Sequence, residues 1–217
     1  MNKTHFQVSG LPRAGSTLLV NLLAQHPDVH GTATSACHET LFQLRNSWTS
    51  WTEHQADKQA AAPKNLHRVL GAMLDAYHDT EKPIIVDKGR GWLHSIEMLE
   101  AAKGSKAKIL VPVRDIAECA ASFETLFRKS AHIRNVPGNF LDTQSTAGRV
   151  RHWTGPGGEI GIAYTRLKDA LLRGYSDRLH LVEFDQLTSN PAETMAKIWN
   201  FLEMAPAEHD FDNVVQV

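Results

Sequence analysis

The stretch FQVSGLPRAGSTLL, residues 6–19, indicates the fold of this chain. Phe6 to Ser9 is typical of a short buried strand, and Ser16 to Gln25 carries leucines on one helical face. Between them lies Gly10 to Thr17, a loop placed where backbone N–H groups and a helix N-terminus together bind anions. Glycines let such a loop curl closely around its ligand. We therefore expect a phosphate-binding loop, although a tight turn without a ligand has a similar pattern.

The loop departs at one position from the phosphate-binding pattern GxxxxGK[ST]. Ser16 stands where that pattern has lysine, and a cation occurs earlier, at Arg13. An ATP-using enzyme needs the lysine on the β- and γ-phosphates and usually binds magnesium. A transferring sulfuryl group carries less negative charge than a phosphoryl group, so fixed cations and backbone dipoles can handle it without a metal. The loop therefore favours sulfate transfer over ATP chemistry.

Strand-like and helix-like segments alternate along the chain. Apolar residues or helix-start signals predict further helices over residues 39–51, 66–77, 95–102, 115–127 and 190–202. Strands are predicted at residues 84–86, 108–113 and 179–184. This order predicts an α/β fold of the P-loop type, with three layers (α/β/α) and a central parallel sheet.

The whole chain, residues 1–217, is predicted to form a single domain. Residues 130–159 are rich in glycine, proline and polar residues, so we expect irregular structure there. Such a long loop is either a lid on the substrate side or a flexible insertion. Its cations, Arg134, Arg149 and Arg151, suit an acceptor with some negative charge.

The composition excludes several classes of protein. The net charge is -1, which argues against a general nucleic-acid binder. The two cysteines suggest no disulfide framework, and no apolar stretch approaches the length needed to span a bilayer. We therefore expect a cytoplasmic protein without a membrane partner. The twelve histidines form no metal-binding motif, so no metal site is predicted.

Two further motifs follow predicted strands. Arg114 ends the strand Val111-Pro112-Val113, and Ser122 comes eight residues after it. An arginine in this place lies where open α/β sheets bind ligands. Asp87-Lys88 directly follows the strand that begins at Ile84.

With these motifs the chain resembles the PAPS-dependent sulfotransferase superfamily, where PAPS is 3′-phosphoadenosine-5′-phosphosulfate. It is most similar to the bacterial, phage and tyrosylprotein-type branch. The resemblance implies that the loop holds the 5′-phosphosulfate and that Arg114 and Ser122 hold the 3′-phosphate. It also implies that Lys88 reaches the reacting sulfate, while Arg13 stabilises the leaving phosphate. The loop residues implied in cofactor binding are Pro12, Arg13, Ala14, Gly15, Ser16 and Thr17.

The general base is less clearly marked. In the tyrosylprotein enzymes a catalytic glutamate follows a stretch like His26-Pro27-Asp28-Val29, but here Gly31 to Thr34 stands at its place. The nearest candidates are Glu39 and His38. Glu39 is the first choice, because a carboxylate in a partly desolvated cleft can have a raised pKa. His38 is the second choice, since histidine has a suitable pKa unaided. His94 lies near the place where the soluble small-molecule enzymes use a histidine.

The predicted activity is transfer of a sulfuryl group from PAPS to a hydroxyl or amine of a small molecule, saccharide or peptide, with release of 3′,5′-ADP and no metal requirement. No nucleic-acid partner is expected. Two alternatives remain open. Ile84 to Asp87 imitates the magnesium-binding strand of ATPases, so a phosphotransferase is one of them. A non-catalytic nucleotide-binding module is the other.

Overall fold

The computed structural model describes residues 3–129 and 144–217. Its centre is a five-stranded parallel sheet with the strand order β2-β3-β1-β4-β5. The strands are β1 (Thr4–Val8), β2 (Val29–Thr32), β3 (Ile84–Lys88), β4 (Ile109–Val113) and β5 (Leu179–Glu183). The predicted parallel sheet is confirmed, and its first strand lies at the centre between β3 and β4.

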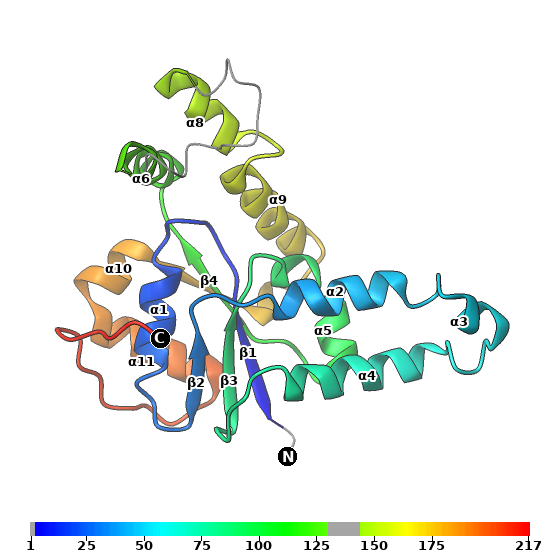
Figure 1. The fold of residues 1–217 in the computed structure, drawn as a ribbon. Helices are drawn as coiled ribbons and strands as arrows, with labels where there is room; N and C mark the ends of the chain where they lie inside the picture. The colour runs from blue at the N-terminus through cyan, green and yellow to red at the C-terminus, as the bar shows by residue number, and fades with distance from the viewer. Residues whose placement is uncertain (1–2, 130–143) are drawn as a thin grey trace.

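Helices cover both faces of the sheet and complete the predicted three layers (Figure 1). One face carries α1 (Ser16–Leu23), α10 (Phe184–Ser189) and α11 (Pro191–Leu202). The other carries α2 (Cys37–Ser47), α4 (Pro63–Ala76), α5 (Ile96–Lys103) and the short helix η1 (Trp92–His94). The remaining helices of the described residues are α3 (Thr52–Ala56), α6 (Ile116–Lys129), α8 (Thr146–Thr154), α9 (Glu159–Leu172) and η3 (Ser176–Arg178). None of the helices in the described ranges is both long and apolar enough to cross a membrane.

A separate apolar cluster lies against the loop that follows β1. Leu11 and Ala14 of the loop pack with Cys119 of α6, Trp153 of α8 and Ile160 of α9. In Figure 1 these three helices stand together above the carboxyl ends of the strands. Because burial of apolar surface stabilises this contact, the loop is held between the sheet and a helical cap.

Two glycines fix the path of this loop. Leu11 donates its backbone N–H to the Pro112 carbonyl oxygen at 2.8 Å, so the loop runs close beside the end of β4. A Cβ atom on Gly10 would stand 2.3 Å from that same oxygen. Gly15 has a φ of 80°, a left-handed conformation that glycine adopts without strain, and a Cβ there would meet Phe184 at 2.8 Å. Neither position has room for a side chain.

The expectation of irregular structure over residues 130–159 is wrong where α8 forms. Arg149 of this helix donates Nε–H to Glu124 Oε2 of α6 at 2.7 Å, and Trp153 stacks on Phe123 with ring centroids 5.4 Å apart. These contacts with a distant segment stabilise the helix, and local composition does not reveal them. Residues 130–143, with Arg134, lie outside the described residues, and the role of 130–159 as a lid stays a prediction.

Candidate functional site

The predicted loop, Lys88 and Arg114 come together at one edge of the sheet. The loop leaves the carboxyl end of β1, Lys88 is the last residue of β3, and Arg114 directly follows β4. Because β3, β1 and β4 are neighbouring parallel strands, these three ends lie side by side. This edge is where ligands bind in open α/β sheets.

Lys88 points to the beginning of α1. Its Nζ donates a hydrogen bond to Thr17 Oγ1 at 3.1 Å. Burial lowers the pKa of Lys88, and the nearby charges of Arg90 and Arg13 lower it further. Within residues 3–129 and 144–217, none of these three cations forms an ion pair with a carboxylate. Three adjacent positive groups without a counterion make this edge attractive to an anion.

Arg13 and Arg114 meet across the loop. Arg13 donates Nε–H to Ser122 Oγ of α6 at 3.0 Å, and Arg114 donates to the Arg13 carbonyl oxygen at 3.3 Å. Arg114 also donates Nε–H to Glu118 Oε2 at 2.7 Å. The structure thus brings Ser122 to the predicted site, but its hydroxyl contacts Arg13 and not Arg114.

A small cleft opens beside Arg114. Its volume is about 250 Å³, and the guanidinium of Arg114 lies 4.1 Å from the centre of the Phe184 ring. The residues that line it come from the ends of β4 and β5 and the segments that follow them: Val113, Arg114, Asp115, Glu183, Phe184 and Asp185. An aromatic ring at the cleft suits a ligand with a planar ring.

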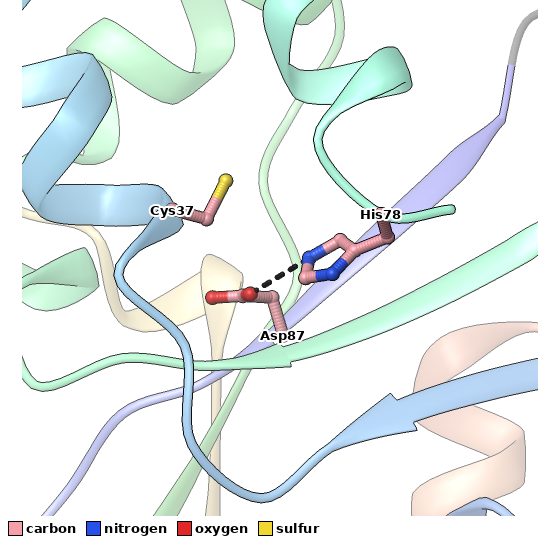
Figure 2. A group of neighbouring side chains, drawn as sticks. All are labelled: Cys37, His78 and Asp87. Atoms are coloured by element: carbon pink, nitrogen blue, oxygen red, sulfur yellow. Dashed lines mark hydrogen bonds and ion pairs between the residues drawn. The ribbon is translucent and has the colours of Figure 1, made fainter. Parts of the chain in front are cut away.

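Asp87 precedes Lys88 in β3, so it points to the opposite face of the sheet, into a buried cluster with Cys37 and His78 (Figure 2). It accepts hydrogen bonds from Trp92 Nε1 at 2.8 Å and from His78 at 3.0 Å, one on each carboxylate oxygen. Burial raises the pKa of Asp87, but the hydrogen bonds of His78, Ser35 and Trp92 outweigh that effect and keep the pKa below its usual value. A magnesium-binding carboxylate must face the phosphates, so the resemblance of this strand to ATPases does not extend to the orientation of Asp87.

The cluster around Asp87 also contains Cys37. The nearest ligand atoms of Cys37, His78 and Asp87 lie within 4.8 Å of one another, the one such group of three or more in the described part of the chain. Both oxygens of Asp87 already accept hydrogen bonds, and burial raises the pKa of the Cys37 thiol, so the thiol is neutral. We therefore interpret the cluster as a structural centre that joins β3 to η1 and to the end of α4.

Replacement of Asp87 by alanine is expected to lower the free energy of unfolding by roughly 3 kcal/mol or more, because buried donors on Trp92 and His78 lose their acceptor. Urea denaturation measures this change. Asp177→Ala is the matched control, since Asp177 is exposed and its pairs with Lys106 and Arg178 lie at the surface. The control should change stability far less, because exposed ion pairs contribute little. Equal losses in the two variants would contradict a structural role for Asp87.

His38 and Glu39, in the first turn of α2, differ in burial. His38 is buried, its Nε2 lies 2.9 Å from Ser95 Oγ, and its ring fills the space beside Gly91. Burial, followed by the charge of Arg166, lowers the pKa of His38 to about 4. The expectation that His38 has a suitable pKa unaided is therefore wrong, because it ignored burial.

Glu39 is exposed, and its Oε1 accepts a hydrogen bond from Gln43 Nε2 at 2.6 Å. The partial desolvation assumed for Glu39 is therefore not found in this structure. His94 is also exposed, with its ring edge-on to Phe42 at 6.0 Å. Of the two neighbours in α2, only Glu39 presents its side chain to solvent, where an acceptor can reach it.

Sequence reasoning missed four residues at this edge. Arg90 lies two positions beyond Lys88 and was within reach of the motif analysis. Arg166 belongs to α9, a helix that was not predicted although Ile160, Leu167 and Ala170 lie on one face of it. Phe184 contacts Arg114 only because the chain folds, and no local signal indicates it. Glu118 pairs with Arg114 at a spacing of four residues, which was within reach of the motif analysis.

A model of a sulfotransferase family matches residues 6–208. The chain belongs to this sulfotransferase family. Solved structures agree on the fold. The sulfotransferase from Alicyclobacillus acidocaldarius is 15% identical, with a TM-score of 0.62 over 100% of this chain and 87% of that chain. The sulfotransferase domain from the curacin biosynthetic pathway is 17% identical, with a TM-score of 0.58 over 96% of this chain and 76% of that chain.

A third solved structure, the sulfotransferase STF1 from Mycobacterium tuberculosis, is 16% identical and has a TM-score of 0.57 over 96% of this chain and 69% of that one. A comparison with curated protein sequences found no match. The resemblance noted in the sequence is thus confirmed at the level of the superfamily, and the P-loop-type α/β/α fold is that of sulfotransferases. The roles of the single residues stay predictions.

Proposed function

We propose that this sulfotransferase moves the sulfuryl group of PAPS to a hydroxyl or amine of its acceptor and releases 3′,5′-ADP. The observation that carries the proposal is the convergence of Arg13, Lys88 and Arg114 on one glycine-containing loop. A donor with one phosphosulfate and a separate 3′-phosphate needs cations at two places. Lys88 and Arg114 stand on opposite sides of β1, at the ends of β3 and β4.

The donor would bind along this edge. The backbone N–H groups of the loop and the N-terminus of α1 would hold the 5′-phosphosulfate. Arg114 would hold the 3′-phosphate, with Ser122 close by through Arg13. The cleft that Phe184 lines beside Arg114 is suited to the nucleoside.

In the reaction the acceptor oxygen or nitrogen forms a bond to sulfur, while the bond from sulfur to the 5′-phosphate oxygen breaks. Negative charge then grows on the leaving oxygen, and Lys88 and Arg13 would stabilise it. The acceptor proton would pass to Glu39 as general base. Fixed cations supply the stabilisation in this scheme, so we propose that turnover needs no metal. A cytoplasmic setting fits the two cysteines, which are buried free thiols.

The donor assignment predicts that 3′,5′-ADP raises the melting temperature more than 5′-AMP does at equal concentration. A ligand that binds only the folded state stabilises it by mass action, and the 3′-phosphate adds the contact with Arg114. Thermal unfolding with each nucleotide measures the difference. Arg114→Gln should remove it. Equal shifts for the two nucleotides would contradict the assignment, and a larger shift with ATP and magnesium would favour the phosphotransferase.

A further inference from the structure

Four cations form a continuous row from the loop to the far side of the site. Arg13 and Arg90 both act electrostatically on Lys88, which places the three charges close together. Arg166 of α9 extends the row, because its guanidinium donates to the Arg90 carbonyl oxygen at 2.9 Å. The proposed reaction uses Arg13 and Lys88. Arg90 and Arg166 lie beyond them, on the side of Glu39.

Arg166 is a half-buried cation whose partner is a backbone oxygen. Within residues 3–129 and 144–217 its guanidinium forms no ion pair, and its one hydrogen bond goes to the Arg90 carbonyl. Burial lowers the pKa of Arg166, the charge of Glu39 opposes this, and Arg90 lowers it further. Because one hydrogen bond occupies only one of its N–H groups, the remaining donors of Arg166 are available to a ligand.

The guanidinium of Arg90, at the surface, also has unused hydrogen-bond donors. Arg90 is exposed, and its guanidinium has no hydrogen bond or ion pair with another described residue. The Arg166 guanidinium lies against the backbone of Arg90, so free donors of two arginines come from neighbouring positions. Guanidinium donors suit a carboxylate, phosphate or sulfate group because such groups accept paired hydrogen bonds. The two arginines belong to different elements, the turn after β3 and α9, so only the folded chain brings them together.

We propose that Arg90 and Arg166 form an anion subsite for the acceptor, so that the enzyme sulfates a molecule that already carries a carboxylate, phosphate or sulfate group. The role of this subsite in acceptor binding rests on the proposed function. The binding of an anion by these two arginines does not depend on that function. The subsite differs from the expectation drawn from the sequence, because Arg149 is paired with Glu124 and Arg134 lies outside the described residues.

A purely structural role for Arg166 is the competing explanation. In that case Arg166 would serve as the counterion of Glu39. The observed geometry does not favour this, since Glu39 Oε1 accepts from Gln43 and no ion pair joins Glu39 to Arg166. The variant Arg166→Gln removes the charge and distinguishes the two roles. If Arg166 belongs to an anion subsite, the variant should bind anions more weakly. If Arg166 is only a counterion of Glu39, anion binding should not change.

The test uses the full chain saturated with 3′,5′-ADP, so that the loop is occupied, and inorganic phosphate as the probe. Isothermal titration is done at constant ionic strength, with acetate and sulfate in parallel to distinguish a carboxylate from a tetrahedral anion. We expect phosphate, sulfate or acetate to bind, and Arg166→Gln and Arg90→Gln each to weaken that binding about tenfold or more. Lys168→Gln, which removes an exposed charge from the same helix, should leave it unchanged.

The outcomes separate this inference from the proposed donor. Absence of binding by all three anions, or equal binding to wild type and both arginine variants, overturns the subsite. Failure of 3′,5′-ADP to bind instead overturns the donor assignment. The titration then proceeds without nucleotide, and loss of phosphate affinity in Arg166→Gln still supports an anion site there. The affinity of both arginine variants for 3′,5′-ADP should equal that of wild type, which places the effect outside the donor site.

Discussion

Replacement of Lys88 by alanine should lower kcat by about a hundred- to a thousandfold, the usual cost of removing one preorganised group that stabilises transition-state charge. Lys88 is half-buried at the end of β3 and held toward α1 by its hydrogen bond to Thr17, so its charge is fixed before the reaction begins. Because that charge acts most strongly on the leaving oxygen as the sulfur–oxygen bond breaks, the loss should appear in kcat more than in donor binding.

The measurement is turnover of labelled PAPS with an acceptor found by screening, together with the affinity for 3′,5′-ADP. This product lacks the sulfuryl group, so Lys88→Ala should lower the affinity for 3′,5′-ADP by a much smaller factor than it lowers kcat. Lys106→Ala is the control, because Lys106 is an exposed lysine whose partner Asp177 lies near the opposite edge of the sheet. A Lys88→Ala enzyme with turnover near that of the control would exclude Lys88 from the chemistry.

The sequence was most informative where local rules decide the structure. The loop between Phe6 and Leu19 was placed correctly, because glycine spacing and helix periodicity are local signals. The strands β3, β4 and β5 were also located, since β-branched and apolar runs bounded by polar residues indicate buried strands. The short strand β2, which contains His30 and Gly31, gave no such signal and was not located.

Features that depend on distant contacts could not be predicted. Helix α8 forms where composition indicated irregular structure, because the Arg149–Glu124 pair joins it to α6. The low pKa of His38 depends on burial against η1, and the availability of Arg166 depends on α9 passing beside Arg90. Sequence motifs therefore indicate the residues that we propose to hold the donor, whereas the residues of the proposed acceptor side meet only through long-range packing.

Glu39→Gln should lower kcat by about a hundredfold or more, because a positioned base makes the acceptor a better nucleophile as it loses its proton. The geometry favours Glu39 over its neighbour. His38 is buried and its Nε2 lies 2.9 Å from Ser95 Oγ, so an acceptor cannot reach it. Glu39 extends from the same turn of α2 into solvent, on the side of the row of cations where Arg166 lies.

The decisive comparison is between Glu39→Gln and His38→Gln, each measured at saturating PAPS and acceptor so that binding losses do not enter kcat. Glutamine at position 38 can keep a hydrogen bond to Ser95, so that variant should retain turnover within several-fold of wild type. Both variants should bind 3′,5′-ADP with the affinity of wild type, since neither residue lies in the loop or contacts Arg114. The reverse pattern would assign the base to His38. Normal turnover in both variants would exclude both residues and make His94, exposed at the end of η1, the next to test.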